Sequence, residues 1–300
     1  MADKRLPPHS LPSAHLGGVK RKLSERAWWP GLKRGLATLF FVLVGYLLVS
    51  QARTIEWGKV LSSLQQYPLT AAWGAVALSA ASFALYSCFD LLGRSYTGHT
   101  LGKPTVMMLT FVSYAFNLNL GSVVGGIAFR YRLYSRLGLE YGVITRILSL
   151  SLLTNWMGYL LLAGAVFSLQ PPALPAQWKI DASQLRLIGI VLLAVAAAYL
   201  GACAFSRQRT LHWRGHAIEL PSLRMAVLQM CMGTANWLLV SGIVFVLLQH
   251  RIEFSTVISV LLLAAIAGVI THIPAGLGVL EAVFVALLSH RMPQHELLAA

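Results

Sequence analysis

Long apolar runs separated by short polar segments make up most of the chain after residue 34. A spanning helix needs about 20 apolar residues. Five runs fit single spans, namely Gly35–Gln51, Thr70–Leu92, Val143–Leu169, Leu185–Phe205 and Leu223–Leu248. Two further runs, Thr105–Phe129 and Ser255–Ser289, are interrupted in the middle by helix-breaking residues. The pattern therefore predicts an all-α polytopic membrane protein with spanning helices and two re-entrant, broken helices.

The interruption in the second broken run is the stretch Thr271–Glu281. Pro274 removes a backbone donor and clashes with the preceding turn, and Gly276 and Gly278 add conformational freedom. Such a break at membrane depth is tolerated where it is buried in protein or lines a cavity. Two ionisable residues border it, His272 and Glu281. An ionisable residue within a membrane is a functional candidate, although His272 also fits a buried, hydrogen-bonded role.

The first broken run is interrupted at Asn117-Leu118-Asn119-Leu120-Gly121, and Arg130 follows it. If the run spans once, the arginine-rich segment after it lies on the external side, against the positive-inside rule. If the chain turns at Asn117–Gly121 and returns, these arginines lie in the cytoplasm. We therefore predict a re-entrant hairpin here. Asp90, near the end of the preceding span, is four residues from Arg94, and we predict a surface ion pair between them, with a role in transport as the alternative.

The predicted elements follow the order span, span, hairpin, span and then span, span, hairpin. The first half comprises residues 35–169 and the second 185–300, within one transmembrane domain, 35–300. A last span after Ala300 would complete a 4+4 arrangement with about six spanning helices and two hairpins. This is the logic of inverted-repeat transporters, whose sites lie at paired interrupted helices. Hydropathy and charge alone support the repeat.

Composition agrees with this pattern. Hydrophobic residues make up 57% of the chain and charged residues 11%, against about 25% charged in a soluble domain. Residues 1–34 hold eight basic and two acidic residues, a net charge of +6 out of +14. We predict a cytoplasmic, largely disordered arm there that binds anionic lipid headgroups. Its charge also fits a topology signal alone, and no nucleic-acid motif accompanies it.

Few residues suggest chemistry. No catalytic triad, metal-ligand spacing or phosphate loop is evident, so we predict no catalytic residue, metal or cofactor. Asn117 and Asn119 suit either capping of the broken helix or hydrogen bonding to a lipid headgroup. Arg130 and Arg132 suit forked bonds to phosphate, although a basic anchor at the membrane surface accounts for them equally well.

These motifs resemble a known family. Asn117–Gly121 with Gly125-Gly126, the segment Arg130–Gly138 and the block His272–Glu281 are similar to the transmembrane domain of lysylphosphatidylglycerol synthases, the flippase half of MprF proteins. The stand-alone YbhN-type bacterial inner-membrane proteins are more similar still. The likeness covers most of residues 35–290. Ala275 stands where the family usually has glycine, and the family's closing helix lies beyond Ala300. Lysyl transfer is not implied, because the soluble aminoacyltransferase domain is absent.

The resemblance implies a multi-pass protein of the bacterial inner membrane that moves or binds a phospholipid or related polar lipid in an intramembrane cavity. The residues expected along the lipid path are Asn117, Asn119, Gly121, Arg130, Arg132, His272, Pro274, Gly276, Gly278 and Glu281. Two other functions stay open. One is a membrane-embedded subunit of a lipid-modifying enzyme. The other is an anchor or partner for a lipid synthase. The sequence does not indicate the oligomeric state.

Overall fold

The computed structural model describes residues 58, 62, 67–172, 174, 181–206, 210–213, 216–271 and 278–299. All of them belong to one compact unit, residues 55–300. The predicted basic arm, residues 1–34, and the predicted first span, 35–51, lie outside the described residues.

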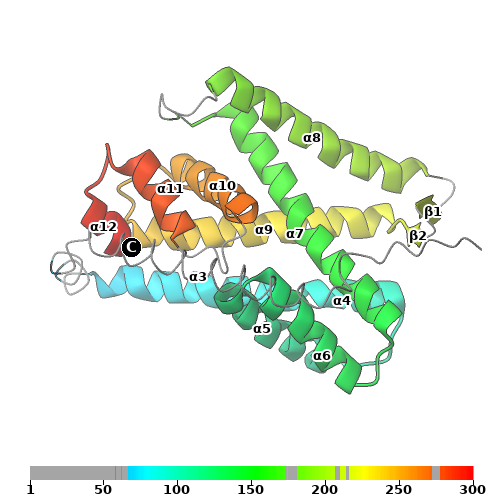
Figure 1. Ribbon diagram of the computed structural model, residues 1–300. Coiled ribbons are helices and arrows are strands. Elements are labelled where there is room, and N and C mark those ends of the chain that lie inside the picture. Colours follow the sequence, from blue (N-terminus) through cyan, green and yellow to red (C-terminus); the bar gives the residue numbers. More distant parts are fainter. Residues whose placement is uncertain are drawn as a thin grey trace, which may run out of the picture. The chain divides into compact units, whose positions relative to one another are not determined.

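The described chain is almost entirely helical, which confirms the predicted fold class (Figure 1). In chain order its elements are α3 (Leu69–Ser87), α4 (Phe89–Thr97), α5 (Lys103–Leu120), the π-helix η2 (Ser122–Ala128), α6 (Phe129–Arg136), α7 (Tyr141–Leu169), α8 (Ala182–Phe205), β1 (Thr210–Trp213), β2 (His216–Glu219), α9 (Leu223–Leu247), α10 (Phe254–Thr271), α11 (Val279–Leu288) and α12 (Gln294–Ala299).

Five helical segments of the described chain are long and apolar enough to cross a membrane. Four of them, α3 with α4, α7, α8 and α9, match predicted spans, and the fifth, α10, forms the first arm of the predicted second hairpin. The span predicted to end at Leu92 continues to Thr97. It is divided at Cys88, whose N–H bonds the carbonyls of Leu85 and Tyr86 at the end of α3.

Helix α7 lies at the centre of the contacts, packing against α4, α8 and α9 (Figure 1). Two glycines make its crossing with α9 close. A Cβ added to Gly158 would lie 2.1 Å from the carbonyl carbon of Gly233, and one added to Gly233 would lie 2.2 Å from the carbonyl oxygen of Thr154. Small residues at a membrane helix crossing let the backbones approach and gain dispersion contacts. This crossing holds the two halves of the described chain together.

The first predicted hairpin is present as a turn at Gly121. Gly121 adopts a positive φ of 82°, where a side chain would be strained, and its N–H bonds the carbonyl of Asn117. The chain then runs back through η2 and α6, both of which pack against α5. Gly125 makes the return close, because a Cβ there would lie 2.1 Å from the carbonyl oxygen of Phe116.

The second hairpin is formed by α10 and α11, which pack on each other through apolar side chains. Its turn, residues 272–277, lies outside the described residues. Val257, Leu261, Val283, Phe284 and Leu287 are among the buried residues of this cluster. After α11 the chain turns into α12, where Glu296 pairs with Arg251 at the end of α9.

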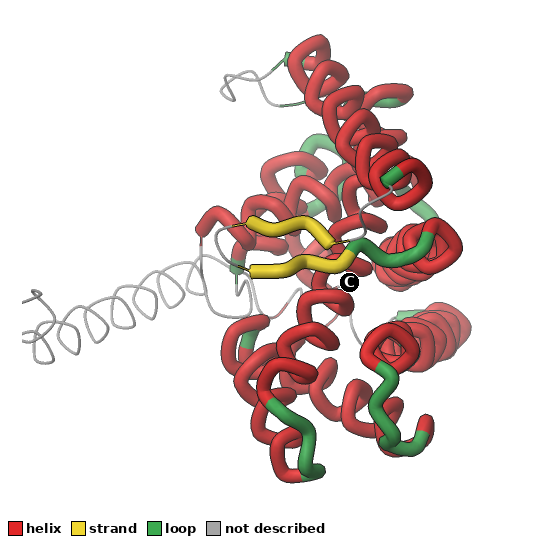
Figure 2. The backbone as a smooth tube through the Cα atoms, turned by 90° about the vertical axis from the view of Figure 1, so that its right-hand side faces the viewer, coloured by secondary structure: helices red, strands yellow, loops and turns green. Residues whose placement is uncertain are grey.

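The segment between α8 and α9 contains an element that the hydropathy pattern did not indicate. Strands β1 and β2 form a two-stranded antiparallel sheet in which Thr210 lies opposite Glu219 and Trp213 opposite His216 (Figure 2). Four-residue strands are too short to stand out from a polar loop in the sequence.

Candidate functional site

A buried ion pair lies where the first hairpin meets the spanning helices. Arg130 Nη1 of α6 lies 3.3 Å from Asp90 Oδ1 of α4, and the two residues are 4% and 0% exposed. The predicted surface pair of Asp90 with Arg94 is therefore wrong. Arg94 instead donates from its Nε to the carbonyl of Leu101 at 2.7 Å. The break at Cys88 starts a new helix at Phe89, and Asp90 in its first turn is fully buried, within contact distance of Arg130.

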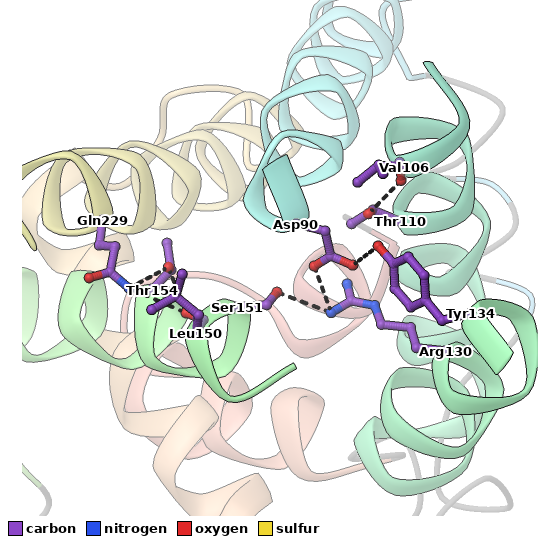
Figure 3. A network of polar contacts seen from close by, with 9 residues as sticks. All are labelled: Asp90, Val106, Thr110, Arg130, Tyr134, Leu150, Ser151, Thr154 and Gln229. Atoms are coloured by element: carbon purple, nitrogen blue, oxygen red, sulfur yellow. Dashed lines mark hydrogen bonds and ion pairs between the residues drawn. The ribbon is translucent and has the colours of Figure 1, made fainter. Parts of the chain in front are cut away.

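Three further side chains surround the pair, and Figure 3 shows two of them, Tyr134 and Ser151. The Tyr134 hydroxyl of α6 donates to Asp90 Oδ2 at 2.9 Å, and Arg130 Nη1 donates to Ser151 Oγ of α7 at 3.0 Å. The guanidinium carbon of Arg130 also lies 5.5 Å from the ring centre of Tyr86, within the range of a cation–π interaction. Elements α3, α4, α6 and α7 therefore meet at this cluster.

Local sequence explains why these groups converge. Asp90 lies in the first turn of α4, where free backbone N–H groups favour a negative charge. Arg130 and Tyr134 are four residues apart on α6 and so lie on the same face of that helix. Gly93, one turn after Asp90, brings α4 close to α7, because a Cβ there would lie 2.9 Å from Ile147 Cγ2.

The cluster does not use all its hydrogen-bonding capacity. Asp90 Oδ1 and Arg130 Nε are buried and have no hydrogen-bond partner within the described part of the chain. Buried polar groups are almost always hydrogen-bonded, and an unpaired one needs an explanation. Arg130 Nε has an N–H without an acceptor, and Asp90 Oδ1 accepts no hydrogen bond although it forms the ion pair with Nη1. The cluster could therefore bind one more polar group.

Two other polar contacts cross the helices near this cluster. Ser82 of α3 donates to Asn236 Oδ1 of α9 at 2.9 Å. Gln229 of α9 donates to Thr154 Oγ1 of α7 at 3.2 Å (Figure 3) and accepts from the Tyr199 hydroxyl at 2.7 Å. These neutral bonds connect helices, as polar side chains commonly do within membranes.

The asparagines of the first break serve the hairpin itself. Asn119 is exposed and its Nδ2 donates to the carbonyl of Ala115 at 2.8 Å. Asn117 is half-buried, and its Oδ1 lies 2.9 Å from where a Cβ of Gly126 would be. Both side chains therefore contact the hairpin backbone, consistent with the structural one of their two predicted roles.

The other predicted path residues are not brought to the ion pair in the described chain. Arg132 is exposed on α6, two residues from the buried Arg130. Gly278 begins α11 with a positive φ of 76°, and Glu281 is exposed in the first turn of that helix. His272, Pro274 and Gly276 lie outside the described residues.

An apolar groove of about 600 Å³ runs between α3 and α5. Val76, Phe83, Met107 and Phe111 are among its lining residues, and Ser87 is one of its few polar ones. Ser87 precedes Asp90 by three residues in the chain. The groove thus has apolar walls for most of its length.

Outside the spans, one titratable group lies close to the cluster. His99 follows α4, and its ring centre is 6.4 Å from that of Tyr134. Partial burial lowers the pKa of His99 and the charge of Arg94 lowers it further, while the charge of Asp90 acts in the opposite direction. Within the ranges described, no three His, Cys, Asp or Glu side chains gather closely enough to hold a metal ion.

The structure adds Asp90, Tyr134 and Ser151 to the candidate residues. Asp90 does carry a signal in the sequence, because an acidic residue inside an apolar run is costly unless it has a partner. Tyr134 and Ser151 carried none, since single tyrosines and serines are common in membrane helices.

Comparison with known proteins places the chain in a family of membrane proteins. A family model described as the lysylphosphatidylglycerol synthase TM region matches residues 35–300, and the chain belongs to this family. It is 47% identical over 261 residues to the inner membrane protein YbhN of Escherichia coli (strain K12), covering 87% of this chain and 82% of that protein. It is also 30% identical over 269 residues to an uncharacterized protein of Synechocystis, covering 88% of this chain and 82% of that protein. The family match and the five long apolar helices of the described chain together identify it as a multi-pass membrane protein.

Proposed function

We propose that this protein is a lipid translocase that binds a phospholipid or related polar lipid within the inner membrane and moves it between leaflets. The observation that carries the proposal is the buried Asp90–Arg130 pair at the junction of the first hairpin with α4 and α7. Ionisable residues inside a membrane protein mark ion and substrate pathways more often than they serve stability.

Stability alone is a weak reason for such a pair. Removing two charges from water costs several kcal/mol per ion, and well-packed apolar residues of similar volume often do as well or better. The hydrogen bonds of this pair are also incomplete, at Asp90 Oδ1 and Arg130 Nε. A pair that is expensive and incompletely bonded suits a site that a ligand enters.

The chemistry of the cluster suits a phospholipid headgroup. Arginine presents a planar fork of N–H groups that matches two phosphate oxygens, and Arg130 has its Nε direction free. The groove between α3 and α5 offers apolar walls for an acyl chain, and Ser87 among its lining residues lies three positions before Asp90 in the chain. A headgroup held at the ion pair avoids much of the desolvation cost of crossing the apolar region.

The remaining candidates extend this path. Arg132 is exposed beside Arg130, where it suits the first contact with a headgroup at the membrane surface. Glu281 is exposed on the otherwise apolar helix α11, where it suits binding of an amine headgroup or a proton. Asn117, Asn119 and Gly121 lie at the turn of the first hairpin, and Gly278 begins α11 of the second. His272, Pro274 and Gly276 stay candidates for the path.

Reconstitution into liposomes tests the proposal. Phospholipids carrying a fluorescent headgroup are placed in both leaflets, and dithionite added outside bleaches those that reach the outer leaflet. In liposomes without the protein, dithionite should bleach about half of the fluorescence, that of the outer leaflet. When the protein is present, we expect nearly all of the fluorescence to be bleached. Protein-free liposomes, and liposomes holding an unrelated multi-pass protein at the same density, control for leakage. Bleaching that stops at about half in all three samples would contradict the proposal.

A further inference from the structure

The ion pair has a property that the proposed translocation does not by itself require. Asp90 and Arg130 neutralise each other, and both are almost fully buried. If the guanidinium turns to another anion, the carboxylate is left as a buried charge without its cation. The fate of Asp90 then decides whether the exchange is energetically possible.

The groups around Asp90 offer no replacement cation. Arg94 donates from its Nε to the Leu101 carbonyl, and partial burial together with the charge of Arg94 lowers the pKa of His99, which disfavours a cation there. The groups around the pair are neutral: Tyr134 on α6, Tyr86 on α3 with Tyr114 of α5 stacked on it, and Ser151 on α7. The polar side chains of α9, Asn236 and Gln229, bond Ser82 of α3 and Thr154 of α7 and are also neutral. Taking up a proton is the way for Asp90 to lose its charge.

We propose that Arg130 changes partner from Asp90 to the phosphate of an anionic phospholipid, and that Asp90 takes up one proton for each lipid bound. This inference rests on the proposed function and adds a substrate charge and a proton linkage to the same site. The proton comes from water and adds to Asp90 Oδ1, the oxygen that faces Arg130 and has no hydrogen bond.

Charge and hydrogen bonds balance in this exchange. Before it, one guanidinium and one carboxylate cancel; after it, one guanidinium and one phosphate cancel beside a neutral carboxyl group. Asp90 Oδ2 keeps the bond donated by Tyr134, and Arg130 Nη1 keeps its bond to Ser151. Nε, which has no partner in the described chain, becomes one arm of the fork on phosphate. No step leaves a net charge in the apolar region.

Proton uptake on binding tests the inference without any transport. The full chain in detergent is titrated with dioctanoyl phosphatidylglycerol in weakly buffered solution containing a pH indicator. We expect about one proton to be taken up per lipid bound, so that affinity falls by about tenfold per pH unit where Asp90 is ionised in the free protein. Binding with no proton uptake and a flat pH dependence would overturn the inference, as would failure of the wild type to bind this lipid.

Three further samples sharpen the test. Asp90→Asn is expected to bind the lipid without proton uptake, and its affinity should not change with pH. If the affinity of this variant still fell by about tenfold per pH unit, the role of Asp90 would be overturned. Asp181→Asn makes the same chemical change at an exposed helix cap and is expected to keep the wild-type slope. Titration with glycerol phosphate distinguishes a free phosphate from a lipid headgroup. If glycerol phosphate bound with the same affinity and the same proton uptake as phosphatidylglycerol, a lipid would be overturned as the ligand. If Asp90→Asn does not fold, the wild-type slope decides alone.

The inference and the proposed function fail separately. A wild type that moves lipid in liposomes but binds phosphatidylglycerol without a proton supports translocation and overturns the linkage. A wild type that takes up one proton per lipid but leaves dithionite bleaching at about half supports the linkage and contradicts translocation.

Discussion

The two hairpins look alike in the sequence and are held in different ways. Each interrupts an apolar run with glycines, and each folds back on itself. The first is fixed to its neighbours by charged and polar side chains, with Arg130 and Tyr134 of α6 bonded to α4 and α7. The second is held largely by apolar contacts in the described residues, between α10 and α11 and a cluster that includes Leu261 and Phe284.

The two hairpins therefore differ in what fixes their position: directed polar contacts in the first, and close apolar packing in the second. Inside a bilayer, apolar side chains gain little by leaving lipid for protein, so apolar contacts position a helix only through close packing. An ion pair with a directed hydrogen bond fixes one residue against another. The first hairpin, which is packed through apolar side chains as well, is therefore the one on which a change of charge also acts, whereas the second depends largely on shape.

The largest effect is expected from breaking the ion pair on one side. Arg130→Gln leaves the Asp90 carboxylate buried without its cation, which costs about 3–5 kcal/mol. The free energy of unfolding, measured by denaturant titration in detergent micelles, should fall by this amount. Arg132→Gln is the matched control, because Arg132 is exposed, and it should change the value by less than about 0.5 kcal/mol. Equal losses in the two variants would contradict the comparison.

A smaller loss is expected where shape holds the first hairpin. Gly125→Ala adds a Cβ that would lie 2.1 Å from the Phe116 carbonyl oxygen, so the π-helix η2, which carries Gly125, must shift. Overpacking of this kind costs about 1–3 kcal/mol. Gly142→Ala, in the first turn of α7, has nothing within 4 Å of the added carbon and is the control. Thermal unfolding that lowers both melting temperatures equally would show that the close approach is not important.

Glu281→Gln should hardly change stability. Glu281 is exposed and has no bond or ion pair within the ranges described, so the substitution should alter the free energy of unfolding by less than about 0.5 kcal/mol. If Glu281 binds a headgroup or proton, the same variant should lose most lipid movement in liposomes. A stable Glu281→Gln protein that moves lipid normally would leave Glu281 with no role in the path.

The mildest test concerns the side of the membrane on which the hairpin begins and ends. Lys103 starts α5 and Arg136 ends α6. Single cysteines at these positions, in a protein without other cysteines, should both resist an impermeant thiol reagent added outside the cell and both react after lysis. Labelling of only one of them in intact cells would make the segment a simple span.

Hydropathy predicted the spans and both broken helices because membrane helices are defined by long apolar runs. It placed the turn at Gly121, whose positive φ suits glycine. It did not predict the partner of Asp90, because the partner lies 40 residues away on another helix and a local arginine, Arg94, had the right spacing. It also missed β1 and β2, whose pairing depends on backbone bonds between short polar segments.

The central claim is that the Asp90–Arg130 pair is there for the lipid and not for the fold. The double variant Asp90→Asn/Arg130→Gln tests it, because it removes both charges together and leaves neither one unpaired. Its free energy of unfolding should recover most of the loss caused by Arg130→Gln alone, while dithionite bleaching in liposomes should stop at about half. A double variant that is stable and moves lipid at the wild-type rate would contradict the account.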